Sequence, residues 1–238
     1  MVIIVRNTSL LARSLDYNRK DFQHDLIEFA QLNRIDGETR LYETPTGERY
    51  PSVTTVLGKM TDKTALNEWK KRVGEEEAAR VSARAASRGT NIHTMCEKYI
   101  LGEEVDTSMP YNMFMFRQLK MVLDEKVDMI RATECTLFSH HLKIAGTCDL
   151  IANYDGRLSI IDYKTSTKRK RKDWIEGYFL QASLYAYMLW EMTGISAKDI
   201  VIMIGVDDEI DAQVFVERPS NYIEKAADLV KSYHRLYA

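Results

Sequence analysis

The segment that decides the fold of this chain runs from residue 142 to residue 164 and reads LKIAGTCDLIANYDGRLSIIDYK. Two apolar-rich runs within it flank Asp155-Gly156, a pair suited to the positive φ angles of a two-residue type I′ turn. The pattern therefore predicts a β-hairpin, and the length of its loop fixes which residues face each other across it.

The register of this hairpin brings charged residues together. With Tyr154 opposite Arg157, Asp149 lies directly opposite Asp162. Lys164 follows Asp162 by two residues, and side chains two apart on a strand share a face of the sheet. We therefore expect all three charged side chains on one face, at the end of the hairpin away from its turn.

Two opposed carboxylates need a positive charge between them. Facing side chains in a ladder have Cβ atoms only about 4.5 to 5.5 Å apart, so bare carboxylates there repel each other. A divalent cation such as Mg²⁺ binds carboxylate oxygens and keeps several waters, which leaves room for phosphate oxygens. Lys164 would orient or help deprotonate an attacking water and offset charge on the phosphoryl oxygens. The alternative is an exposed hairpin with a surface salt bridge that has no function.

The same residues resemble the core motif of the PD-(D/E)XK nuclease superfamily, in which one Asp is followed by Asp or Glu, any residue, and Lys. Further segments narrow the resemblance to the RecB-like branch, and within it to the mitochondrial genome maintenance and phage exonucleases. These segments are Tyr50–Leu57 (YPSVTTVL), Arg88–Glu97 (RGTNIHTMCE) and Gln181–Tyr185 (QASLY). They occur in the expected order across residues 40–192.

The resemblance implies an α/β fold with a mixed, restriction-endonuclease-like sheet flanked by helices and an N-terminal helical elaboration. It implies that Asp149, Asp162 and Lys164 are catalytic and that the cofactor is Mg²⁺ or Mn²⁺. The metal would be bound by His93, Asp149, Asp162 and the backbone carbonyl of Tyr163.

Helical spacing places further residues beside this centre. Glu97 lies one turn after His93 and shares its face, where it could support a ligand or contact substrate. Gln181 and Tyr185 are also one turn apart, in a stretch whose apolar residues are mostly core. The resemblance implies that they face the active site, where the amide could hold Lys164 or a phosphate and the phenol could contact DNA.

Two upstream positions are also tied to the site by the resemblance. Ser52 and Thr54 are expected to contact phosphates, and Ser52 is also suited to cap a short helix. Glu134 precedes the hairpin in an alternating run from Arg131 to Ser139. An acidic residue before the first Asp can assist metal binding in the wider superfamily, but we do not count Glu134 among the expected ligands.

A basic run follows the catalytic lysine directly. Such a run is usually a solvated loop, but its position beside the predicted metal centre favours sequence-independent contacts with phosphates. The residues concerned are Thr165, Lys168, Arg169, Lys170, Arg171 and Lys172. Trp174 could stack on a base or anchor the start of the next helix in the core, and we favour the core.

The other segments complete the expected α/β order. We expect residues 1–130 to form a hairpin and helical region that carries the His motif and packs on a nuclease core at 131–238, in one compact domain. The N-terminal region should hold a small hairpin at 40–44 and 48–50, helices across 63–101 interrupted near Gly74 and Gly89, and a helix at 111–129. The core should hold strands at 131–138, 142–154 and 157–164, a helix at 174–192, strands at 200–206 and 212–217, and a helix at 220–236.

Composition limits the alternatives. The formal net charge is only −2, so any nucleic-acid surface is a local patch, which argues against a coating or packaging protein. Three cysteines cannot supply the four ligands of an iron–sulfur cluster, so none is expected. No apolar run approaches the roughly 20 residues of a membrane span. We expect a cytoplasmic protein, in the host for a phage product; the arginine-containing Met1–Leu15 segment makes the mitochondrial matrix the alternative.

The sequence therefore predicts a Mg²⁺- or Mn²⁺-dependent DNA exonuclease that acts on free ends of single-stranded DNA in replication, recombination or repair. Its partners would be DNA and replication or recombination proteins, without a membrane. The alternatives are a structure-specific endonuclease or resolvase on the same fold, and a non-catalytic nucleic-acid-binding module.

Overall fold

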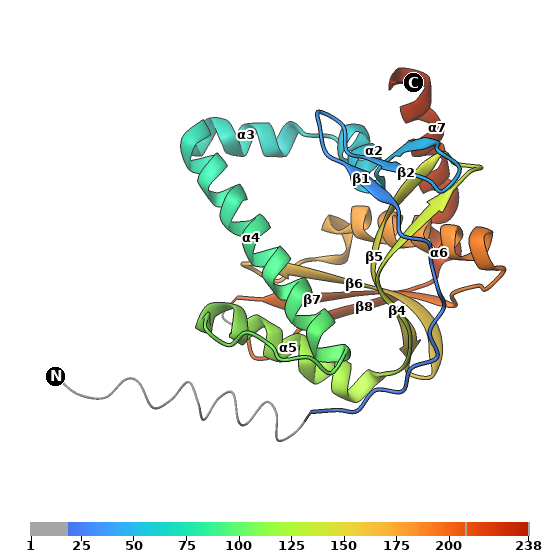
Figure 1. Ribbon diagram of the computed structural model, residues 1–238. Coiled ribbons are helices and arrows are strands. Elements are labelled where there is room, and N and C mark those ends of the chain that lie inside the picture. Colours follow the sequence, from blue (N-terminus) through green and yellow to red (C-terminus); the bar gives the residue numbers. More distant parts are fainter. Residues whose placement is uncertain (1–18, 208, 238) are drawn as a thin grey trace.

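A five-stranded mixed sheet lies at the centre of the structure, a computed structural model that describes residues 19–207 and 209–237 (Figure 1). Its strands, in spatial order, are β4 (Val127–Ser139), β5 (Ile144–Tyr154), β6 (Arg157–Ser166), β7 (Asp199–Val206) and β8 (Gln213–Glu217). Neighbours are antiparallel except β6 and β7, which are parallel. This is the predicted α/β sheet. The Met1–Leu15 segment lies outside the described residues.

The turn of the β5–β6 hairpin is the predicted two-residue loop. Asp155 and Gly156 have φ angles of 47° and 72°, as a type I′ turn requires. The ladder runs from Tyr154 opposite Arg157 to Leu150 opposite Ile161, which confirms the predicted register over this part. In the described chain the ladder stops there, one residue short of the expected Asp149–Asp162 pair, so their direct opposition is wrong.

The parallel pair at the centre of the sheet follows from the next helix. Two parallel strands need a long crossover, and α6 (Glu176–Thr193) supplies it between β6 and β7. Every residue of β7 is buried, and its apolar run Ile200–Ile204 shows no alternation. Such a run is expected of a strand that is covered on both faces.

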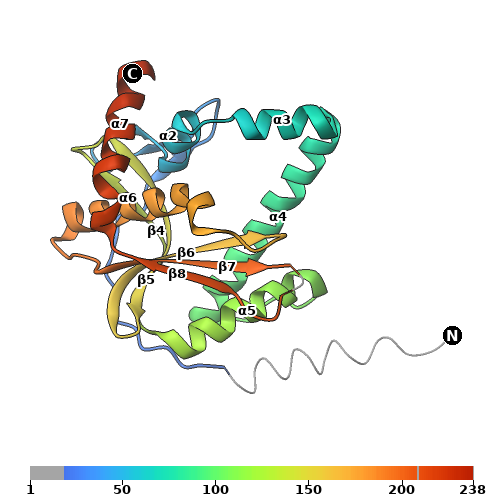
Figure 2. The same cartoon turned by 180° about the vertical axis from the view of Figure 1, so that it is seen from behind.

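Helices cover the two faces of the sheet (Figures 1 and 2). One side, which we call the α6 face, carries α6, α2 (Val53–Met60) and α7 (Ile223–Tyr237). The other, the α4 face, carries α4 (Glu75–Ile100) and α5 (Pro110–Lys126). Along β6 the side chains alternate between them, with Ile160 packed under α6 and Ile161 packed under α4.

A small antiparallel sheet lies against β5. It consists of β1 (Asn33–Ile35), β2 (Leu41–Glu43) and β3 (Arg49–Pro51), and β2 and β3 are the predicted hairpin. Ser52 follows β3, forms a parallel bridge with Ala145 of β5, and caps α2 by accepting a hydrogen bond of 3.0 Å from the Thr55 N–H. The predicted cap is confirmed, and it fixes where α2 starts beside the main sheet.

The helical region departs from prediction at two points. Gly74, with a φ of 89°, separates α3 (Thr64–Val73) from α4 as expected, but α4 continues through Gly89, so an interruption there is wrong. A single glycine costs a helix only about 1 kcal/mol, which its neighbours can offset. The helix predicted at 111–129 is wrong at its end, because residues 127–129 begin β4 and pair with β5.

Short 3₁₀ turns lead into the last two helices, η1 (Lys172–Trp174) before α6 and η2 (Pro219–Asn221) before α7. The remaining core elements lie within a few residues of the predicted boundaries. Among the helices of residues 19–207 and 209–237, none combines the length and the apolar character that crossing a bilayer requires.

Replacing Gly89 by Ala should stabilise the protein. A Cβ at this position would meet no other atom within 4 Å, and alanine favours the helix over glycine by about 0.5 to 1 kcal/mol. Urea unfolding followed by circular dichroism should show this gain for Gly89→Ala. Gly74→Ala is the control and should lose stability, because the φ of Gly74 is positive. A loss of stability in Gly89→Ala would show that α4 is not regular at this residue.

Candidate active site

The site begins where strand alternation reverses at Glu134 and Asp149. The β4–β5 pairing resumes on either side of these two residues, and Glu134 has a φ of 43°, unusual for a residue with a side chain. Cys148 packs on the α6 face, whereas Leu150, two residues later, packs on the α4 face. Side chains of β5 therefore do not alternate regularly between the two faces of the sheet here, and the irregularity lies at Asp149.

The hairpin strands separate at the same place. The N–H of Tyr163 donates to Oδ2 of Asp149 at 2.8 Å, so a side-chain carboxylate takes a backbone donor on β6. This is the physical reason that Asp149 and Asp162 do not face each other across a regular ladder. It places the Asp149 carboxylate between β5 and β6.

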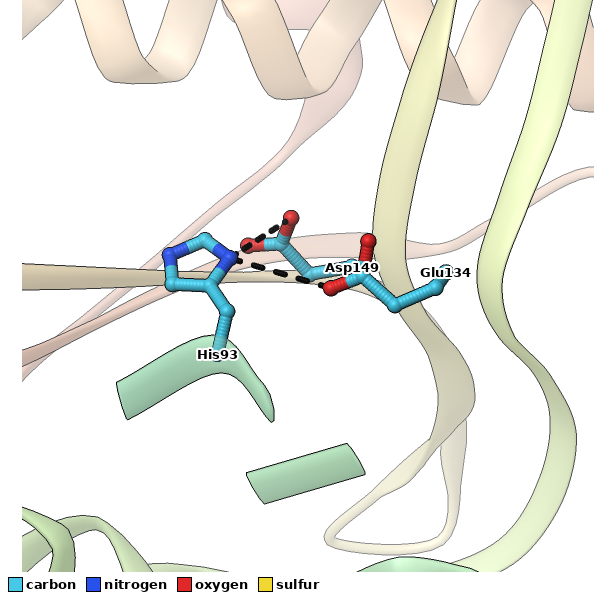
Figure 3. Close-up of side chains that lie close together, drawn as sticks. All are labelled: His93, Glu134 and Asp149. Carbon is cyan, nitrogen blue, oxygen red and sulfur yellow. Dashed lines mark ion pairs between the residues drawn. The ribbon is translucent and has the colours of Figure 1, made fainter. Parts of the chain in front are cut away.

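His93 approaches this carboxylate from α4 (Figure 3). Its Nδ1 lies 3.3 Å from Oδ1 of Asp149 and 3.8 Å from Oε1 of Glu134. The three residues each offer one ligand atom, and these atoms lie within 4.8 Å of one another. His93 and Asp149 were expected here. Glu134 was not, because the positive φ that turns its side chain toward the site leaves no mark in the alternation of the sequence.

The other imidazole nitrogen has a different partner. Nε2 of His93 lies 2.8 Å from the backbone carbonyl of Tyr163, which can accept its hydrogen and orient the ring. A metal-binding histidine commonly donates its second nitrogen to a carbonyl or carboxylate in this way. The Tyr163 carbonyl, expected from the sequence as a metal ligand, is thus the hydrogen-bond partner of His93 in the metal-free structure.

Electrostatics show that this group of residues needs a cation. Burial disfavours the charged imidazole, but the carboxylates of Asp149 and Glu134 outweigh burial and raise the pKa of His93 to about 10. Burial likewise opposes ionisation of Asp149, but the positive charge of His93 outweighs it and lowers the pKa of that carboxyl. The imidazolium thus supplies the positive charge that the two acids require.

The donor set fits a divalent cation. Two carboxylates and an imidazole stand close enough to share one ion, and Nδ1 of His93 can turn its lone pair to them while Nε2 donates to the carbonyl. Carboxylate and water ligands suit Mg²⁺ and Mn²⁺, and imidazole extends the set toward Mn²⁺. A bound ion would replace the proton as the positive charge of this cluster.

The second half of the site lies on the α6 face. Asp162 is 2% exposed; its Oδ1 accepts a hydrogen bond of 3.0 Å from Nε2 of Gln181, and its Oδ2 forms an ion pair with Lys164. Burial raises the pKa of Asp162 to about 6 although Lys164 opposes the shift. Gln181 was expected to contact Lys164 or a phosphate. Here it donates a hydrogen bond to Asp162, the ion-pair partner of Lys164. The Nζ of Lys164 also lies 5.1 Å from the ring centroid of Tyr178, a residue not singled out from the sequence.

Tyr185 packs against the hairpin backbone instead of facing substrate. Its ring and hydroxyl lie 3.0 Å from the point where a Cβ on Gly146 would be, so only glycine fits there without movement. The tyrosine is 3% exposed, and the expected contact of its phenol with DNA is wrong. Gly146 and Tyr185 instead fix the distance between α6 and β5.

An open cleft of about 520 Å³ leads to His93. It lies between α4 and β4, and its lining residues are Gly89, Thr90, His93, Thr94, Glu97 and Glu134. Glu97 was expected near the centre and lines this cleft; burial and the charge of Glu134 raise the pKa of its carboxyl. Because Gly89 has no side chain, it narrows this cleft less than a larger residue would.

Three more expected contacts surround the site. Thr54 is exposed, but Ser52 is 2% exposed and its hydroxyl serves the helix cap, so a direct phosphate contact by Ser52 is wrong. Thr165 accepts a hydrogen bond of 3.2 Å from Nε of Arg88 on α4. Arg88 was not singled out from the sequence, although it begins the His motif.

The basic run lies on the surface, but it is partly neutralised. Three of its five cations have carboxylate partners, in the pairs Arg169–Glu209, Arg171–Asp173 and Lys172–Glu217. Trp174 is 65% exposed, and the guanidinium of Arg171 lies 5.5 Å from its ring centroid. The preferred assignment of Trp174 to the core is wrong, which leaves its ring open to solvent at the start of α6.

This chain belongs to the PD-(D/E)XK nuclease superfamily. The model of that family matches residues 56–230, a stretch that contains His93, Glu134, Asp149, Asp162 and Lys164. The resemblance of the motifs and the expected fold class are thereby confirmed.

Two known proteins are similar to this chain over half of its length. The chain is 29% identical over 129 residues to mitochondrial genome maintenance exonuclease 1 of Homo sapiens, and 29% identical over 133 residues to the Xenopus tropicalis protein of that name. Each match covers 50% of this chain but only 38% and 37% of the relatives. A solved structure titled "Crystal structure of SSO0001" is 16% identical with a TM-score of 0.42, covering 79% of this chain and 76% of that one.

Glu134→Gln should weaken metal binding. The substitution keeps the size of the side chain but removes one of the two anionic oxygens beside His93, so we expect the affinity for Mn²⁺ to fall at least about tenfold in isothermal titration calorimetry. Glu97→Gln, in the same cleft but outside the group of close ligand atoms, is the control and should change the affinity less. Equal losses would show that only the total negative charge of the cleft matters.

Proposed function

We propose that this chain is a Mg²⁺- or Mn²⁺-dependent deoxyribonuclease that hydrolyses phosphodiester bonds from free ends of single-stranded DNA, in DNA replication, recombination or repair. The observation that carries the proposal is the buried pair of Lys164 with Asp162 next to the close group of His93, Glu134 and Asp149. Membership of a nuclease superfamily supports this chemistry.

The residues of the site would have different roles in this reaction. His93, Glu134 and Asp149 would hold the cation, with Asp162 beside them. When bound, the ion polarises the phosphate and lowers the pKa of a water molecule. Lys164 carries an ammonium group whose ion pair with Asp162 keeps it charged, so it offsets negative charge on the phosphoryl oxygens. Gln181 fixes the Asp162 carboxylate and through it the position of the ammonium group.

The helical region supports action at free ends. None of the residues of α3 is buried, and in the first half of α4 only Ala78 is, so this part of the chain stands away from the core. Figures 1 and 2 show α3 and the start of α4 as an arch between α2 and the lower end of α4. An arch of this kind would confine a strand that enters by its end. Both relatives are named as exonucleases.

The proposal also includes the compartment in which the enzyme acts. We propose a cytoplasmic enzyme, in the host cytoplasm for a phage product, that works beside replication or recombination proteins. The mitochondrial names of the relatives favour the matrix as the alternative compartment.

Lys164→Ala and Asp162→Ala should each abolish metal-dependent shortening of end-labelled linear single-stranded DNA. Each removes a charge that the mechanism requires, and chelation of the metal should have the same effect as either substitution. Each also leaves an unpaired buried charge, which typically costs about 3 to 5 kcal/mol of stability, so thermal melts must accompany the assay.

A double variant separates catalysis from folding. Asp162→Asn combined with Lys164→Met removes both charges and leaves no buried ion alone, so the protein should fold and remain inactive. Shortening that persists in a folded double variant would place the catalytic centre elsewhere.

A closed circle distinguishes an exonuclease from the alternatives. Linear single-stranded DNA should be degraded in Mn²⁺ while a covalently closed circle of the same sequence stays intact, because a circle offers no end to enter the arch. Both substrates are compared on denaturing gels. Cutting of the circle would identify an endonuclease or resolvase, and binding without cleavage of either substrate would identify a non-catalytic module.

A further inference from the structure

A second cleft, of about 430 Å³, opens on another side of the protein. It lies where α7 packs beside α2, together with β2, β3 and the turn between β4 and β5. Its lining residues, all in the described part of the chain, include the cations Arg49, Lys59 and Lys143 and no carboxylate. In a chain with a formal net charge of −2, this is a local concentration of positive charge.

Two of the three cations are available to a ligand. Arg49 is paired with Glu43 at 3.0 Å. Within residues 19–207 and 209–237, neither Lys59 nor Lys143 has a carboxylate partner. Lys59 lies in the last turn of α2, and its Nζ donates to the Thr39 hydroxyl at 3.5 Å. The cleft therefore presents two ammonium groups that have no carboxylate partner among residues 19–207 and 209–237.

Aromatic rings stand next to these ammonium groups. The Nζ of Lys59 lies 4.7 Å from the ring centroid of Tyr237 and 5.8 Å from that of Tyr233. Tyr237 is 54% exposed, whereas Tyr233 is buried and anchors α7. A cationic groove with an accessible aromatic ring is the combination that binds single-stranded nucleic acid, with phosphates on the cations and a base on the ring.

Backbone strain supports a role for Lys143. Its φ is 52°, a left-handed conformation that residues with a Cβ rarely adopt and that glycine adopts without strain. The turn is held in place, because the ring of His234 on α7 hydrogen-bonds to the carbonyl of Leu142 at 3.0 Å. A lysine kept where glycine would be more stable points to a use for its side chain.

The cleft is connected to the metal centre by continuous strands. β3 carries Arg49, and Ser52, just after it, forms a parallel bridge with Ala145 of β5, four residues before Asp149. Residues 49–52 and residues 145–149 run in the same direction, one after the other. Together they span on the order of 20 Å, at about 3.3 Å per residue. A strand of nucleic acid would have to be several nucleotides long to reach both places.

We propose that this cleft is a second binding site for single-stranded nucleic acid, in which Lys59 and Lys143 contact phosphates and Tyr237 stacks on a base. The choice of nucleic acid over an acidic peptide rests on the proposed function. The site holds a substrate strand at a distance from the point of cleavage, so it affects long substrates and leaves short ones unchanged.

Fluorescence anisotropy in chelator tests this site without cleavage. Labelled single-stranded DNA of about 30 nucleotides should bind the Lys59→Ala/Lys143→Ala variant about tenfold more weakly than the wild type, with a salt slope smaller by about 1.4 for two lost phosphate contacts. Tyr237→Ala should weaken binding at least about fivefold through lost stacking.

Two controls address charge and folding. Lys198→Glu changes an exposed lysine that does not line the cleft and should leave the affinity unchanged. Lys143→Gly relieves the positive φ, so it should melt at a higher temperature than the wild type and yet bind the long strand more weakly. A stabilised variant with reduced affinity cannot be explained by unfolding.

The outcomes separate this inference from the proposed function. Unchanged affinity in the cleft variants, or no binding of the long strand by the wild type, overturns the inference. Polyglutamate that displaces the strand from the wild type as well as unlabelled DNA does would identify an acidic protein partner and overturn it as well. Binding that depends on the cleft, in a protein that cleaves no DNA in Mn²⁺, would support the inference while the proposed function fails.

Discussion

The site depends on the reversal of strand alternation at Glu134 and Asp149. Glu134 has a positive φ, and next to it Cys148 and Leu150, two residues apart on β5, pack on opposite faces of the sheet although the β4–β5 register is unchanged. Asp149 then takes the N–H of Tyr163, and β5 and β6 separate beside it. At this break His93 of α4 contacts Asp149, and Gln181 of α6 contacts Asp162.

Two cations balance the buried acids from opposite faces. His93 comes from α4 and faces Asp149 and Glu134, while Lys164 pairs with Asp162 beneath α6, where Gln181 holds the same carboxylate. Buried charges persist when they are paired and hydrogen-bonded, and the residues that pair with Asp149 and Asp162 come from α4, β6 and α6. In the metal-free structure the imidazolium supplies the positive charge that a bound metal ion would take over.

Local signals predicted much of this architecture. The type I′ turn and its register were readable because Asp155-Gly156 requires positive φ angles and loop length fixes pairing. The failures share a different origin. Trp174 was assigned to the core because aromatic residues at a helix start usually pack inward. Its side chain is instead exposed, and its described ring contact is with the guanidinium of Arg171. Tyr185 was expected to reach DNA, but its distance to Gly146 depends on how closely α6 packs on β5.

The sequence by itself determined the hairpin, the order of strands and helices, and the positions of the acids and lysine that we propose carry the chemistry, because turn preferences and spacing along a strand act between near neighbours. Only the tertiary structure decided that Glu134 joins His93 and Asp149, that the Tyr163 carbonyl orients the imidazole, and that Gln181 holds Asp162. It also gathered Lys59, Lys143 and Tyr237 into one cleft. The direction of a side chain follows from backbone angles and packing between segments far apart in the chain, and no local pattern encodes those contacts.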